Sequence, residues 1–177
     1  MNTMNQRGFS LVELIISIAI ITLITGVILA RYGSFNSTVL LTSLAYDIAL
    51  SIREAQVLGI SVRGDAGAFS DAYGMHFTEG VTYLLFIDSD DSGDYDDGEE
   101  ISSYTIGQSN AITDLCVNSA CNRSSLDVLF RRPEPDAIIA ADPSLPNIDS
   151  ARVIVGSPDG KVRTVRIWPT GQIAVEE

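Results

Sequence analysis

The sequence is poor in the residues that build metal and catalytic centres. Its 177 residues include two cysteines and a single histidine, His76. A closed zinc site would need several carboxylate ligands, which structural zinc sites rarely use. The histidine lies in a strand-like run, Tyr73 to Phe77, where a packed or surface position is more common than a catalytic one. The sequence therefore favours neither a zinc protein nor an enzyme.

Basic residues are also scarce. Eleven lysines and arginines face 23 acidic residues, and the formal net charge is −12. This balance argues against a general nucleic-acid coat and favours cations or basic surfaces as partners. The charges are unevenly placed, since eight acids lie between residues 88 and 100 and seven basic residues lie after residue 120.

Proline is absent from residues 9–58, and four of the six prolines lie within residues 132–150. The first segment can therefore form an uninterrupted helix, and the second is expected to be a loop around one short strand. No internal repeat or low-complexity linker is present. The length suits one domain plus an anchor.

The two cysteines, Cys116 and Cys121, have four residues between them, in an Asn/Ser-rich stretch. This spacing is compatible with a small disulfide loop, which would add about 2 kcal/mol by the chain-entropy estimate. The alternative is two free thiols. A disulfide is favoured if the domain lies outside the cytosol.

The chain opens with a polar stretch, residues 1–8, followed by an apolar run from Phe9 to Ala30. As a helix, this run would span about 33 Å, enough to cross the hydrocarbon core of a bilayer. A cleaved signal peptide would have a shorter apolar region and a small-residue cleavage site after it. Here Arg31 and more helix-compatible sequence follow, so the segment is expected to be retained.

One residue is unusual for a plain anchor. Glu13 lies inside the apolar run, where an acid at mid-bilayer costs about 2.5 to 3.5 kcal/mol on insertion scales. Such a residue is expected to have a partner.

The segment Gly8-Phe9-Ser10-Leu11-Val12-Glu13-Leu14 resembles the prepilin peptidase recognition sequence of type IV pilin-like proteins. The resemblance implies cleavage after Gly8 and N-methylation of the new first residue, Phe9. It also implies a single-pass protein of the cytoplasmic membrane, with its globular domain outside the cytoplasm, that later enters a filament.

The expected role of Glu13 follows from this cleavage. The new α-amino group of Phe9 would have a pKa of about 7.7 to 8 and would be mostly protonated at neutral pH. In apolar surroundings it could neutralise Glu13 of the same or a neighbouring subunit. Such a pair would set the axial register of an assembly.

The helical pattern continues beyond the membrane-length segment. Apolar residues recur at steps of three and four on one face: Leu41, Leu44, Ile48, Ile52 and Ala55. Asp47, Ser51 and Glu54 are expected on the opposite side, and Gly59 is expected to cap the helix.

Short β-rich runs then alternate with turns. They are Tyr73 to Phe77, Thr82 to Asp88, Ile101 to Ile106, Asp127 to Arg131, Ala137 to Ala140, Arg152 to Gly156, Lys161 to Trp168 and Gln172 to Val175. The predicted fold is α+β, with a long helix packed against antiparallel sheets. The predicted segments are a leader, residues 1–8; a membrane or filament-core helix, 9–30; its amphipathic continuation, 31–59; and a β-rich domain, 60–177.

The layout resembles the minor pilins and pseudopilins related to those of type II secretion. The shared features are an apolar strand leading into an Asp/Gly-rich loop and a final strand pair that turns at Thr170-Gly171. This resemblance implies other pilin subunits, a prepilin peptidase and methylase, an inner-membrane assembly platform and, before assembly, membrane lipid as partners.

The acidic loop from Asp88 to Glu99 matches a calcium-loop pattern. The expected ligands are Asp88, Asp90, Ser92, the carbonyl of Asp94, Asp96 and Glu99, with Gly93 at the sharp turn. The loop follows a predicted strand, so it is not a helix-loop-helix EF-hand. The alternative is a solvated acidic turn.

A second function is compatible with the carboxy-terminal strands. Arg163 and Arg166, near Trp168, could contact DNA, as in minor pilins of DNA-uptake filaments. The alternative is a solvated sheet surface whose charges protect an edge.

Overall fold

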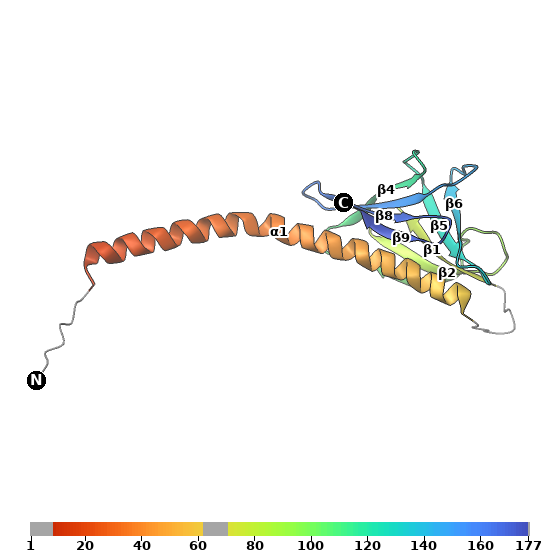
Figure 1. Cartoon of the computed structure of the whole chain (residues 1–177), viewed down its shortest axis with the longest axis horizontal. Helices are drawn as coiled ribbons and strands as arrows, with labels where there is room; N and C mark the ends of the chain where they lie inside the picture. Colours follow the sequence, from red (N-terminus) through yellow and green to blue (C-terminus); the bar gives the residue numbers. More distant parts are fainter. Residues whose placement is uncertain (1–8, 62–70, 177) are drawn as a thin grey trace, which may run out of the picture. The chain divides into compact units, whose positions relative to one another are not determined.

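The structure is a computed structural model that describes residues 9–61 and 71–176, with the side chains of residues 30–36 excluded. One helix, α1 (Leu11–Ile60), precedes the strands of the described part (Figure 1). The strands are β1 (Ala72–Thr78), β2 (Thr82–Asp88), β3 (Glu100–Thr105), β4 (Ala111–Val117), β5 (Ser125–Phe130), β6 (Ala137–Asp142), β7 (Ala151–Gly156), β8 (Val162–Ile167) and β9 (Ile173–Glu176). The chain divides into two units, Met1–Ser37 and Thr38–Glu177.

The second unit contains two antiparallel sheets. The larger has the order β3-β2-β1-β5-β6, and the smaller has the order β4-β7-β8-β9. The turn Ser157-Pro158-Asp159-Gly160 joins β7 to β8, and its glycine has a φ of 81°, a value that glycine adopts without steric cost. The predicted α+β fold with antiparallel sheets is confirmed.

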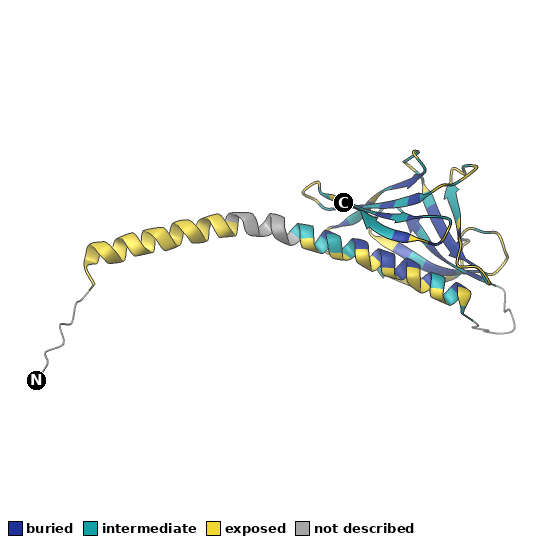
Figure 2. Cartoon of the chain, viewed as in Figure 1, coloured by how far each residue is buried: buried dark blue, intermediate teal, exposed yellow. Residues whose placement is uncertain are grey.

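The core of this unit lies between the helix and the inner faces of both sheets (Figure 2). From α1 it receives Leu41, Ala45, Ile48, Ile52 and Ala55, all buried. Their spacing of three and four residues places them on one face of the helix. The predicted apolar face is therefore confirmed.

Ser51 does not lie on the solvent side, and that prediction is wrong. It is buried, with its hydroxyl 3.3 Å from the hydroxyl of Tyr83 on β2. Tyr83 in turn stacks on Tyr104, with ring centroids 5.0 Å apart. A small hydroxyl at the border of the apolar face is tolerated because it finds a polar partner.

One strand was not predicted. Residues Ala111–Val117 form β4, which pairs with β7, and Cys116 on it is buried. The Asn/Ser-rich stretch around the two cysteines instead predicts a polar loop. Packing against β7 outweighs this weak local preference.

Gly59 does not end the helix, which continues to Ile60. Gly59 is instead buried where α1 crosses the end of β5, and a Cβ there would overlap the carbonyl oxygen of Phe130. The glycine is thus required for close approach of two backbones rather than for a left-handed cap.

We therefore expect Gly59→Ala to lower the thermal stability of the Thr38–Glu177 unit. Alanine favours helix by about 1 kcal/mol over glycine, but the steric overlap with strand backbone is expected to cost about 1 to 3 kcal/mol. Thermal melting followed by circular dichroism measures the net effect. Gly107→Ala is the matched control, since nothing lies within 4 Å of a Cβ at Gly107. An unchanged or raised Tm for Gly59→Ala would contradict the close approach.

Candidate functional site

The amino-terminal end of α1 carries Glu13, the acidic residue within the apolar run. The amide of Leu14 donates to the carbonyl oxygen of Ser10 at 3.1 Å, the first hydrogen bond of the described helix. Glu13 therefore lies in the first helical turn, where the helix dipole favours a carboxylate. Phe9 is 80% exposed. The predicted cleavage residue Gly8 lies outside the described residues.

Ser10 and Glu13 also have the spacing of a capping box. Ser10 precedes the first helical residue and Glu13 is the third residue of the helix, the positions at which serine and glutamate satisfy free backbone amides. We had not predicted this role, although the Ser-x-x-Glu pattern is visible in the sequence. Glu13 is thus placed to favour helix initiation as well as any contact with another group.

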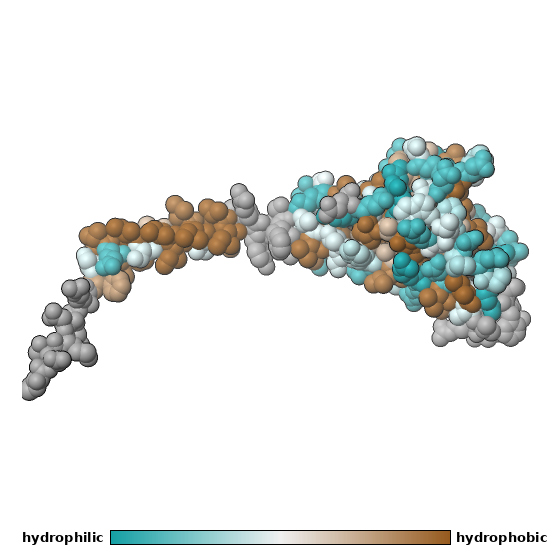
Figure 3. All heavy atoms as spheres, viewed as in Figure 1, coloured by the Kyte–Doolittle hydropathy of each residue, from teal (hydrophilic) through white to brown (hydrophobic). Residues whose placement is uncertain are grey.

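The segment Leu11–Leu29 has the length and composition of a membrane-crossing helix. Its mean hydropathy is 2.6, and none of it is buried. Figure 3 shows a largely hydrophobic surface along this part of α1. Together with the sequence pattern at its start, this segment suggests a membrane-anchored protein.

The acidic loop wraps around the carboxylate at the end of β2. The side chain of Asp88 is fully buried. Its oxygens accept hydrogen bonds from the backbone amides of Ser92 at 3.0 Å and Gly93 at 3.2 Å. Gly93 has a φ of 87°, which allows the chain to turn sharply there.

Glu99 closes the loop from the other end. Its carboxylate accepts hydrogen bonds from the amide and hydroxyl of Ser89, at 2.7 and 2.9 Å, and from the amide of Asp96 at 3.1 Å. Asp88, Asp90 and Glu99 each offer an oxygen within 4.8 Å of the others. The fold therefore brings together three of the predicted metal ligands.

The remaining predicted ligands are Ser92, the carbonyl of Asp94 and Asp96, and not all of them lie near the three close carboxylates. The hydroxyl of Ser92 donates to the carbonyl oxygen of Asp94 at 3.1 Å, so these two ligand atoms are adjacent. Asp96 is not a member of the group of close carboxylates. An all-oxygen set of this kind suits a hard cation such as Ca²⁺.

Arg131, which directly follows β5, provides a positive charge that we did not predict at this loop. Its Nη2 lies 3.3 Å from Oδ2 of Asp88 and also contacts the carboxylate of Asp91. Burial raises the pKa of Asp88, while the loop amides and Arg131 act in the opposite direction. The loop therefore already contains one partner for its negative charge.

Tyr95 anchors the same loop to the outer face of the larger sheet. Its ring centroid lies 5.4 Å from that of Phe86 and 4.6 Å from that of His76. His76 is partly buried, and its Nδ1 lies 2.6 Å from Oδ1 of Asp127. The histidine thus packs within the sheet surface beneath the loop.

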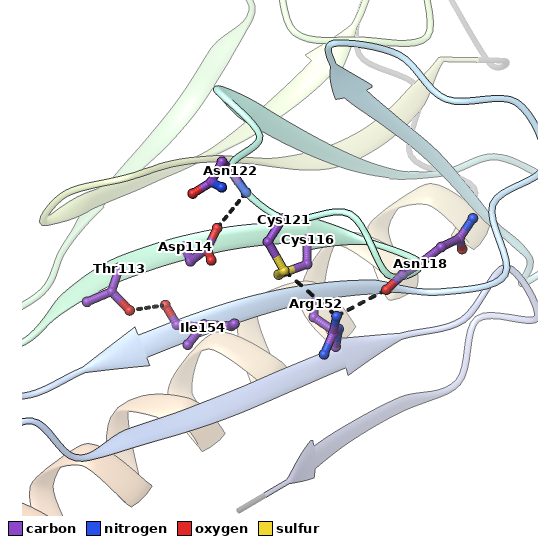
Figure 4. The surroundings of a disulfide bond; sticks show 8 residues. All are labelled: Thr113, Asp114, Cys116, Asn118, Cys121, Asn122, Arg152 and Ile154. Atoms are coloured by element: carbon purple, nitrogen blue, oxygen red, sulfur yellow. Dashed lines mark hydrogen bonds between the residues drawn. A yellow bond between two sulfur atoms is a disulfide. The ribbon is translucent and has the colours of Figure 1, made fainter.

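The two cysteines form the predicted disulfide (Figure 4). Cys116 belongs to β4, so the bond fastens the following turn to a buried strand. Arg152 on the neighbouring strand donates to the carbonyl oxygen of Asn118 at 3.1 Å. The disulfide and this hydrogen bond hold the turn at two points.

The structure does not bring Arg163 and Arg166 together. They are three residues apart on β8 and therefore point to opposite faces of the sheet. Arg163 donates to Oγ1 of Thr42 on α1 at 3.3 Å. Arg166 pairs with Glu176 at 3.2 Å and lies 5.6 Å from the ring centroid of Trp168. These two arginines do not form a single basic surface for DNA.

The comparison with known protein families gives one match. The family described as the prokaryotic N-terminal methylation motif matches residues 3–29. No curated protein and no solved structure matches the chain. The match ends with the apolar span, Leu11–Leu29. The amino-terminal motif thus supports a type IV pilin-like protein that is processed by prepilin peptidase.

Proposed function

We propose that this protein is a structural subunit of a type IV pilus-like or type II secretion-like filament. The observation that carries the proposal is the match to the methylation motif over residues 3–29, which includes an apolar helical span, Leu11–Leu29, with no buried residue. A separately packed unit, Thr38–Glu177, follows on the same chain. This arrangement supplies a processing site, an assembly element and a domain to be displayed.

The apolar span explains why such a protein would assemble. Apolar surface left in water costs about 25 cal/mol per Å², so Leu11–Leu29 requires lipid or other apolar helices around it. Membrane lipid would cover it before assembly, and the helices of other subunits would cover it in the filament. The methylated amine of Phe9 would then meet the carboxylate of Glu13, which lies in the first helical turn.

Among pilin-like proteins, we assign this chain to the minor pilins or pseudopilins. This assignment is supported by the long apolar strand β2 that leads into the acidic loop and by the final hairpin of β8 and β9. In this assignment the amino terminus faces the cytoplasm, the β-rich domain lies outside it, and an inner-membrane platform inserts the subunit.

We also propose that the loop from Asp88 to Glu99 binds one Ca²⁺. The support is the group of three close carboxylates and the adjacent oxygens of Ser92 and Asp94. The ion would neutralise a loop that carries more acids than Arg131 can balance. It would strengthen the link between the end of β2 and the start of β3, because the loop joins them.

The proposed processing site is tested by Gly8→Leu. A bulky side chain at the scissile bond is expected to block cleavage, so the full-length chain should accumulate in the membrane. Immunoblotting of cells that contain the peptidase measures the chain length. A normally shortened product from Gly8→Leu would show that cleavage does not follow this glycine.

The proposed assembly role is tested by Glu13→Ala and Glu13→Gln. Both remove the charge that would pair with the Phe9 amine, and we expect cleavage to persist while the amount in sheared filaments falls. Glu13→Gln keeps the side-chain size, so it separates the loss of charge from the loss of packing. If either cleaved variant reaches filaments at the unmodified level, the charge is not needed for assembly.

Calcium binding is tested on the Thr38–Glu177 unit. At a hundredfold excess of ion over its dissociation constant, linkage predicts about 2.7 kcal/mol of added stability, which is visible as a higher Tm. Extracellular sites of this kind bind with dissociation constants of about 0.1 to 1 mM, so the titration should reach tens of millimolar. Magnesium is expected to substitute poorly, because it prefers compact octahedral shells.

Asp90→Asn combined with Glu99→Gln should abolish the calcium-dependent shift. These changes leave Asp88 in place, since it also holds the loop amides and Arg131. Asp97→Asn is the matched control, because Asp97 lies in the same loop but outside the group of close carboxylates. Equal Tm values in chelator and in excess calcium for the unmodified domain would mean that the loop is a solvated turn.

A further inference from the structure

A cavity of about 200 Å³ lies within the Thr38–Glu177 unit, between α1 and the segment that follows β3. The helix lines it with Leu40, Ser43, Leu44 and Asp47. Their spacing of three and four residues places these four side chains on one side of the helix. The volume corresponds to about six or seven water molecules at about 30 Å³ each, so a small organic group fits inside it.

A buried amide group without a partner lines this cavity. Asn110 is 5% exposed, and its backbone amide donates to the carbonyl oxygen of Gly107 at 3.3 Å. Within residues 9–61 and 71–176, no hydrogen bond to the carboxamide of Asn110 is present. Buried polar side chains normally have a hydrogen-bond partner, because their desolvation is otherwise unfavourable. The carboxamide of Asn110 therefore points to a polar ligand in the cavity.

The charge that lines the cavity is negative. Asp47 is exposed, and in the described part of the chain its carboxylate has no ion pair or hydrogen bond. Among the described residues, none that lines the cavity is basic. Burial raises the pKa of the neighbouring Tyr83, and the charges of Asp47 and Glu54 add to this rise, whereas the hydrogen bond with Ser51 opposes it. The cavity therefore favours a cation over an anion.

The rest of the lining limits the kind of cation. Leu40 and Leu44 are half-buried and Ile106 is buried, so part of the wall is apolar. The ring of Tyr83 is stacked with Phe77 on β1 and Tyr104 on β3, at centroid distances of 5.6 and 5.0 Å. Because strands on both sides of β2 cover this ring, it does not present a free face to a cation. A divalent metal ion would also find only one carboxylate, fewer than hard cations normally use.

We propose that this cavity binds an alkylammonium group, the chemical group at the end of a lysine side chain. The ammonium group has three hydrogen-bond donors and no acceptor. It would donate to the carboxylate of Asp47, the carboxamide oxygen of Asn110 and the hydroxyl of Ser43, while its alkyl stem lies against Leu40 and Leu44. This proposal goes beyond the filament function and does not depend on it.

Saturation-transfer NMR of the full-length chain in deuterated detergent micelles tests the proposal, with n-butylammonium chloride as the probe. The unmodified chain should transfer saturation to the probe, and n-butanol, which has the same stem without the charge, should receive much less. Asp47→Asn keeps the side-chain size and removes the charge, so it should weaken binding severalfold. Glu134→Gln is the matched control, because Glu134 is exposed in the segment between β5 and β6 and does not line the cavity.

Asn110→Ala should also weaken binding of the probe severalfold, because it removes the buried carboxamide. Circular dichroism reports whether this variant remains folded. If it does not, Asp47→Asn decides the outcome, since Asp47 is exposed and its replacement leaves the core intact.

A second probe, Nα-acetyl-lysine methylamide, distinguishes two sources of the ammonium group. Binding at least as tight as that of n-butylammonium, and lost in Asp47→Asn, would support a lysine of a partner protein as the ligand. Weaker binding with the same loss would support a free amine. The proposal is wrong if n-butylammonium does not bind the unmodified chain, if n-butanol binds equally well, or if Asp47→Asn binds the probe as the Glu134→Gln control does.

Discussion

The apolar surface of α1 must be covered both in Leu11–Leu29 and in the part that belongs to the Thr38–Glu177 unit. In the Thr38–Glu177 unit the two sheets cover one face, where Leu41, Ile48 and Ile52 are fully buried or nearly so. In the first unit, no part of Leu11–Leu29 is covered by the protein itself. One helix therefore combines an amphipathic segment, which holds a domain together, with a largely apolar segment that the protein itself does not cover.

A charged residue on α1 limits how the helix can pack in apolar surroundings. Glu13 occupies the first helical turn, where its charge is compatible with the helix dipole and would be costly if carried unpaired into an apolar phase. Apolar contact is non-directional, so a charge such as that of Glu13 is what would give an assembly of these helices a defined axial register.

The α+β fold, the apolar face of the helix and eight of the strands could be predicted because periodicity and turn residues report them locally. The strand β4 could not, because its pairing with β7 outweighs an unfavourable local pattern. The role of Gly59 was missed for the same reason, since its neighbour Phe130 is remote in sequence. Spacing alone predicted that Asp88, Asp90 and Glu99 lie close together, whereas Asp96 is outside this group. Arg131 and Tyr95 could not be predicted there, because their contacts depend on how β5 and the loop meet on the sheet surface.

Identifying the amino terminus of the chain recovered from filaments tests the proposed filament role. Mass spectrometry of the protein in sheared filaments should show an amino-terminal peptide that begins at N-methylated Phe9, with residues 1–8 removed. Recovery of a chain that still begins at Met1, or complete absence of a folded, membrane-inserted chain from the filament fraction, would contradict it.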